Sequence, residues 1–309
     1  MLCHLGERVI MAKVDYRKYL ALSSLVALAI AHPTGATAQI FRSVNFSEHP
    51  GPATSSAEGV EVTMQPNIDS DNQIIVAAAI RIPGFQSIIV NEESASSASY
   101  ARWVGIGKLA ANDPAPSVLL QGFSGGAHCC ATLLVITPSV GRLKVITFDA
   151  VDGEGETSFP RDIDGDGTVD FVRQDDSFRY QFASGAGSYS PPVILNVYKG
   201  QLVDVSVQPA YRTLWIKFAA QTRAACADHS NDDRNGACAA YVAASARLGK
   251  FETAMVEVDK LVNQKPGIEL PTNCAAAQVN YACPAGKEIK FSTFRSALVW
   301  FLQKKGYID

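Results

Sequence analysis

Residues 162–170 read Asp-Ile-Asp-Gly-Asp-Gly-Thr-Val-Asp, an acidic loop that stands between short runs of β-forming residues. A Ca²⁺ ion takes roughly six to eight oxygen ligands, and alternating Asp residues around a glycine turn can direct several carboxylates toward one ion. The spacing therefore predicts a structural calcium site. The alternative interpretation is a solvated acidic turn that binds no metal. The predicted ligands are Asp162, Asp164, Asp166, the backbone carbonyl of Thr168, and Asp170.

The residues that flank the loop predict a turn before it and a strand after it. An EF-hand would need glutamate at the twelfth position, where this chain has Arg173, and no helical pattern follows. An Asp-rich loop that leads directly into a strand resembles the calcium loop of FG-GAP and VCBS-type β-propeller repeats, over residues 162–172. The resemblance implies that the ion supports a β-rich fold.

The chain from residue 39 to residue 207 is a series of short β-rich runs separated by Gly, Pro, Asn, Asp and Ser. Runs that recur at intervals of roughly ten to fifteen residues with turn residues between them favour an all-β sandwich, barrel or partial propeller. The predicted strands are residues 59–64, 73–82, 87–91, 101–107, 117–123, 131–137, 143–148, 169–173, 194–198 and 202–207.

After residue 207 the apolar residues recur with the period of a helix. Predicted helices cover residues 209–226, 237–248 and 251–263, and a last helix begins near Ser292, its expected N-cap, and stops at Gly306. The expected fold class is therefore α+β. An N-terminal all-β domain, a sandwich or a partial propeller, spans residues 39–207, and a small disulfide-stapled helical domain spans residues 208–309.

One helical pair has a recognisable pattern. Residues 237–266 resemble a single, degenerate tetratricopeptide (TPR-like) hairpin, because Gly249, Phe251, Ala254 and Pro266 stand at the repeat's glycine, aromatic, alanine and proline positions. A single hairpin of this kind cannot bury its apolar face alone, so we expect it to pack on the other helices.

Residues 1–38 predict a secretory signal peptide that is removed. Basic residues precede an apolar run at residues 19–31, and Ala36-Thr37-Ala38 is a small-residue cleavage site. The start codon is either Met1 or Met11. The apolar run is shorter than a membrane helix needs, and no later stretch is long enough to span a bilayer. The chain has a formal charge of −3, which does not favour nucleic acid as a ligand. We therefore expect a periplasmic or secreted protein without a transmembrane segment after cleavage.

Export places the cysteines of the mature chain in an oxidising compartment. Short spacing favours the pairs Cys226–Cys238 and Cys274–Cys283. Cys129 and Cys130 are adjacent, so they predict either a disulfide between neighbours or, with His128, a site for a soft metal.

Residues 122–130, Gly-Phe-Ser-Gly-Gly-Ala-His-Cys-Cys, contain the G-x-S-x-G pattern of some hydrolases. This pattern suggests Ser124 as a nucleophile and His128 as its partner. However, a nucleophile elbow opens a helix, whereas residues 131–136 form a β-branched and leucine-rich run. The interpretation that we favour is a glycine turn between two strands. The stretch GGAHCC also resembles uncharacterised secreted bacterial proteins, and that resemblance implies no activity.

Together these patterns favour an exported, calcium-stabilised binding or structural module over an enzyme. Its partner would be a protein or another ligand of the cell envelope that the sequence does not identify. The alternative is a secreted hydrolase that uses Ser124 and His128.

Overall fold

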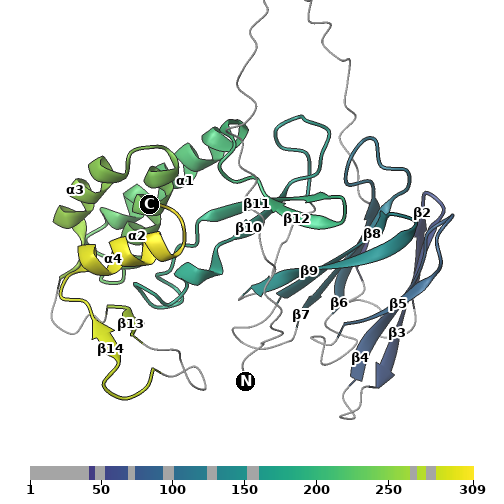
Figure 1. The fold of residues 1–309 in the computed structure, drawn as a ribbon, viewed down its shortest axis with the longest axis horizontal. Coiled ribbons are helices and arrows are strands. Elements are labelled where there is room, and N and C mark those ends of the chain that lie inside the picture. The colour runs from purple at the N-terminus through teal and green to yellow at the C-terminus, as the bar shows by residue number, and fades with distance from the viewer. Residues whose placement is uncertain are drawn as a thin grey trace, which may run out of the picture. The chain divides into compact units, whose positions relative to one another are not determined.

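The computed structural model describes residues 42–45, 53–68, 74–92, 101–123, 131–151, 160–264, 270–275 and 283–309. These residues form two compact units (Figure 1). The first consists of the described parts of Met1–Phe171 with Leu195–Val203, and the second of Val172–Ile194 with the described parts of Asp204–Asp309. The second unit thus includes residues 172–194, which precede the boundary expected at residue 207. The expected domain boundaries stay a prediction.

One sheet of the first unit is an antiparallel meander in the order β2–β3–β4–β5. Strand β3 shows why these residues form a half-buried sheet. Val60, Val62 and Met64 are buried, whereas Glu61 and Thr63 between them are partly exposed. Alternation with period two places the apolar side chains on one face. The strands are β2 (Ala53–Ala57), β3 (Val60–Ile68), β4 (Ile74–Arg81) and β5 (Ile88–Glu92).

The other large sheet of this unit has the order β1–β6–β7–β8–β9. Strand β8 is buried continuously from residue 131 to residue 137, which is the pattern of a strand covered on both faces. Its strands are β1 (Arg42–Asn45), β6 (Ala101–Gly107), β7 (Ser117–Phe123), β8 (Ala131–Ser139) and β9 (Arg142–Val151).

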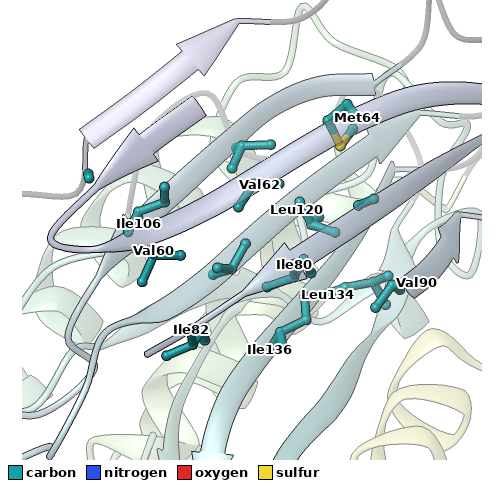
Figure 2. Close-up of a cluster of buried hydrophobic side chains, with 14 residues drawn as sticks. Val60, Val62, Met64, Ile80, Ile82, Val90, Ile106, Leu120, Leu134 and Ile136 are labelled. Atoms are coloured by element: carbon teal, nitrogen blue, oxygen red, sulfur yellow. The ribbon is translucent and has the colours of Figure 1, made fainter. Parts of the chain in front are cut away.

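Two apolar clusters cover the two faces of this second sheet. On one face, Leu134 and Ile136 pack with Val62 and Ile80 of the meander, so that the two sheets form a sandwich (Figure 2). The side chains of the opposite face form a second cluster with residues from outside both sheets. Its fully or nearly buried members are Leu109, Leu119, Leu133, Val135, Ile146, Phe148, Val169, Phe171 and Val197. This second cluster holds the strand that follows the acidic loop.

A third, three-stranded sheet has the order β10–β11–β12 and comprises β10 (Phe171–Gln174), β11 (Pro192–Tyr198) and β12 (Gln201–Asp204). The two short strands β13 (Thr272–Cys274) and β14 (Glu288–Lys290) form an antiparallel pair.

The second unit is built around α2 (Asn235–Arg247), which is buried from Asn235 to Ser245. Its alanines allow α1 (Arg212–Cys226) and α3 (Phe251–Leu261) to pack closely on it. The helix α4 (Phe294–Lys304) buries Phe294, Ala297, Leu298, Phe301 and Leu302, a stripe at helical spacing.

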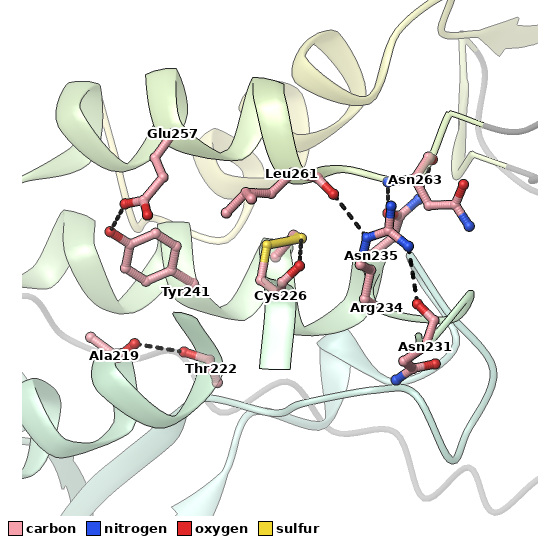
Figure 3. The surroundings of a disulfide bond; sticks show 11 residues. Ala219, Thr222, Cys226, Asn231, Arg234, Asn235, Tyr241, Glu257, Leu261 and Asn263 are labelled. Carbon is pink, nitrogen blue, oxygen red and sulfur yellow. Dashed lines mark hydrogen bonds between the residues drawn. A yellow bond between two sulfur atoms is a disulfide. The ribbon is translucent and has the colours of Figure 1, made fainter. Parts of the chain in front are cut away.

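Two disulfides lie in the second unit. Cys226 at the end of α1 is bonded to Cys238 in the first turn of α2, with Cα atoms 4.7 Å apart (Figure 3). Cys274 of β13 is bonded to Cys283, with Cα atoms 5.6 Å apart.

The structure confirms the α+β fold class, with a β-rich N-terminal region that forms a sandwich and no closed barrel among the described residues, followed by disulfide-linked helices. Some predicted bounds were wrong. The N-cap of α4 is Thr293 rather than Ser292, because the Thr293 hydroxyl accepts from the Ser296 amide in a capping box. Strand β12 ends at Asp204, whose side chain accepts hydrogen bonds from the amide and hydroxyl of Ser206. Within the described residues, no helix combines the length and apolarity that a membrane crossing requires.

Candidate metal site

The acidic loop is anchored to the backbone of residues 109–111. The Val169 amide donates to the Leu109 carbonyl at 2.7 Å, and the Ala111 amide donates to the Gly167 carbonyl at 2.9 Å. Isolated bridges pair Ala110 with Thr168 and Arg161 with Asp170. The buried side chain of Val169 then enters the second apolar cluster. The loop is therefore attached to the core of the sandwich at its carboxyl end.

Within the loop, the aspartates accept hydrogen bonds from amides a few residues further along. Asp162 accepts from the amides of Gly165 at 2.7 Å and Gly167 at 2.9 Å. Asp166 accepts from the amide of Thr168 at 2.7 Å. Gly165 and Gly167 have φ angles of 80° and 86°, a left-handed conformation that favours glycine. These bonds fold the loop tightly around its own carboxylates.

This folding brings three of the predicted ligands together. Asp162, Asp164 and Asp166 each offer a carboxylate oxygen, and these oxygens lie within 4.8 Å of one another. Like charges at this separation repel, and a hard divalent cation is the partner that carboxylate oxygens favour. The arrangement could therefore hold an ion such as Ca²⁺.

The structure places Asp170 differently from the other aspartates. It is 1% exposed, and its two carboxylate oxygens accept from the Ile163 amide and from the Asn196 side chain, each at 2.8 Å. The Asn196 amide group also donates to the Val169 carbonyl at 3.0 Å. Asp170 thus joins the start of the loop to strand β11. Its role as a direct ligand, like that of the Thr168 carbonyl, stays a prediction.

Sequence reasoning did not find Asn196. It stands 26 positions after Asp170 in an ordinary β-rich run, so no local pattern marks it. A buried carboxylate needs hydrogen-bond donors, and that requirement was the one available signal. It did not indicate which donor the fold would supply.

The other predicted candidates are Ser124, His128, Cys129 and Cys130, and all of them lie outside the described residues. The hydrolase hypothesis and the pairing of the adjacent cysteines therefore stay predictions. The signal peptide at residues 1–38 also lies outside the described residues.

The α1–α2–α3 assembly has its own polar contacts (Figure 3). Glu257 accepts from the Tyr241 hydroxyl at 2.9 Å (Figure 3). It also pairs with Arg223 at 2.5 Å. The hydrogen bond from Arg223 is the main cause that lowers the pKa of Glu257. At the start of α2, the Asn235 side chain donates to the Asn263 carbonyl and accepts from the Asn263 amide. These bonds fix the beginning of α2 to the end of α3.

Comparisons with known proteins match parts of the chain. The profile of a family described as the sll0997 C-terminal domain matches residues 216–306, which lie in the helical unit. Probable thylakoid lumen protein sll0997 of Synechocystis sp. is 30% identical over 200 residues, which are 64% of this chain and 58% of that protein. Uncharacterized protein y4bJ of Sinorhizobium fredii is 30% identical over 198 residues, which are 62% of this chain and 30% of that protein. The chain thus spans less than two thirds of the length of either relative. No solved structure matches the chain.

Proposed function

We propose that this protein is an exported binding or structural module in which Ca²⁺ bound by the acidic loop stabilises the β-sandwich. The observation that carries the proposal is the cluster of Asp162, Asp164 and Asp166 oxygens within 4.8 Å of one another. Export is supported by the two disulfides, since such bonds persist in oxidising compartments. It is also supported by the similarity to a protein named as a probable thylakoid lumen protein.

The ion would act on the fold through the loop backbone. By offsetting the repulsion among the three carboxylates, it would favour the closed loop that hydrogen-bonds to residues 109–111. The same loop ends at Val169, which belongs to the second apolar cluster. Calcium binding to the loop would therefore also stabilise the second apolar cluster, which Val169 joins. This role requires no reaction, and the partner of the module stays unidentified.

The expected affinity follows from the class of site. Exported calcium modules bind with dissociation constants of about 10⁻⁴–10⁻³ M. At ~1 mM calcium and a dissociation constant of ~10⁻⁴ M, linkage gives about 1.4 kcal/mol of added stability.

Isothermal titration calorimetry with Ca²⁺ tests the proposal. We expect one site per chain, and we expect Asp164→Asn to weaken it by about tenfold or more, because it removes one of the clustered charges. Glu58→Gln is the matched control, since Glu58 is exposed on the β2–β3 turn of the same unit. The proposal fails if the wild-type protein takes up no calcium, or if both variants bind it as the wild type does.

A further inference from the structure

A segment from before the helices lies in the same compact unit as the helices. Residues 175–188, here named the docked segment, belong to this unit although β11 and β12 separate them from α1. The family profile that matches the helical region covers residues 216–306 and so does not include the docked segment.

Two aromatic side chains anchor the docked segment. The ring centroid of Phe178 lies 4.8 Å from that of Phe301 and 5.5 Å from that of Tyr307, both edge-on. Phe182 lies 5.3 Å from Phe294 and 5.4 Å from Phe301. Phe178 and Phe182 are 2% and 4% exposed. Edge-to-face pairs at these distances are favourable beyond the area that they bury. Side chains of α4, together with Tyr307 beyond its end, thus receive two aromatic anchors.

Charged groups hold both ends of the docked segment. At its start, the Tyr307 hydroxyl donates to the Asp175 carboxylate at 2.9 Å. Burial raises the pKa of Tyr307, as does the charge of Asp175 beside it, so this hydroxyl stays a donor. Near its end, the Asp233 carboxylate accepts from the amide of Ser184 at 3.0 Å and also from the Ser184 hydroxyl.

Two glycines allow the docked segment to approach α2. A Cβ atom on Gly236 would overlap the carbonyl of Gly187, and one on Gly187 would overlap Asp233. Gly236 therefore lies directly against the backbone of Gly187, and Gly187 lies against the Asp233 side chain, so an added Cβ atom at either glycine would clash. The aromatic anchors, the charged ends and this close approach together define a site with specific requirements.

We propose that the helical domain carries a binding site for a short polypeptide segment, and that residues 175–188 occupy this site within the same chain. The preferred ligand has an acidic residue, aromatic residues three and seven positions later, and then serine and glycine. This inference concerns the helical domain alone and does not depend on calcium.

Binding of a peptide to the full chain tests the proposal. In the variant Phe178→Ala/Phe182→Ala, the chain's own segment loses its anchors, so a labelled peptide of residues 172–194 should bind about tenfold or more tightly to it than to the wild type. A peptide in which both phenylalanines are alanine should bind about tenfold or more weakly. Fluorescence anisotropy measures both affinities. Ala186→Ser is the control protein, because Ala186 lies in the same segment but is exposed, and it should behave as the wild type.

A double variant that keeps its helical circular dichroism and yet binds no peptide would overturn the proposal. If the double variant does not fold, native-state hydrogen exchange of the wild type decides instead. We expect the Ser184 amide to exchange faster than the central amides of α2, because a docked segment can open while the helices stay folded. Exchange of both at one common rate would show that the segment is an inseparable part of the core.

Discussion

Replacing Asn196 by alanine should destabilise the β-sandwich unit more than any exposed substitution on the same strand. The Asn196 side chain supplies one donor to the Asp170 carboxylate and one to the Val169 carbonyl. In Asn196→Ala both acceptors lose that donor. Asp170 is 1% exposed, so water cannot readily replace the lost bond.

The magnitude follows from the two lost hydrogen bonds. A hydrogen bond to a charged group contributes about 1.5–3 kcal/mol, and one between neutral groups contributes about 0.5–1.5 kcal/mol. The expected loss is therefore about 2–4 kcal/mol of unfolding free energy, or a fall in Tm of roughly 5–15 °C for a domain of this size.

Urea and thermal unfolding of the purified protein give this loss directly. Tyr198→Ala is the matched control, because Tyr198 lies on β11 and is 61% exposed, and it should change stability by no more than about 0.5 kcal/mol. Combining Asn196→Ala with Asp170→Ala should be less than additive, since each change removes the hydrogen bond between these two side chains. The reasoning is refuted if Asn196→Ala costs no more than the control, or if the two changes are strictly additive.

Three further outcomes follow from the helical unit. Under mild reductant the partly exposed disulfide Cys274–Cys283 should open before the fully buried Cys226–Cys238, and thiol alkylation with mass mapping gives the order. Because the pKa of Glu257 is lowered from 4.5 in the folded state, its stabilising effect is present above that value and is lost as the pH falls through the lower folded pKa. The difference in urea stability between the wild type and Glu257→Gln should therefore shrink between pH 6 and pH 3, and an unchanged difference would contradict this. Gly236→Ala should lower Tm, because the added methyl group would overlap the carbonyl of Gly187. An unchanged Tm would contradict this close approach.

Much of the fold could be predicted from periodic patterns. The run at residues 131–137 indicated a strand, and the structure shows why it is apolar throughout, since both faces of β8 are covered. The TPR-like spacing at residues 237–266 remains an untested resemblance, although α2 and α3 do form where helices were expected. Local periodicity suffices for such elements because it records which faces are buried.

The remaining features depend on contacts between residues that are distant in sequence. The inclusion of residues 172–194 in the helical unit rests on contacts such as Phe178 with Phe301, and no local pattern predicts them. The acidic loop contains one feature that local spacing predicts and one that depends on a distant contact. The spacing of Asp162, Asp164 and Asp166 indicated their cluster, but the burial of Asp170 beside Asn196 is set by the packing of β11.

The most direct test of the calcium proposal is thermal unfolding of the same protein in ~1 mM Ca²⁺ and in excess chelator. An added stability of about 1.4 kcal/mol should raise Tm by roughly 3–6 °C in calcium. Magnesium at the same concentration should reproduce little of this increase, because it demands a tighter octahedral site. Asp164→Asn should remove most of the calcium response, because a tenfold weaker site keeps only about 0.4 kcal/mol at ~1 mM calcium, whereas Glu58→Gln should keep it. If the wild-type protein instead melts at the same temperature in calcium and in chelator, the acidic loop does not use calcium to stabilise the fold.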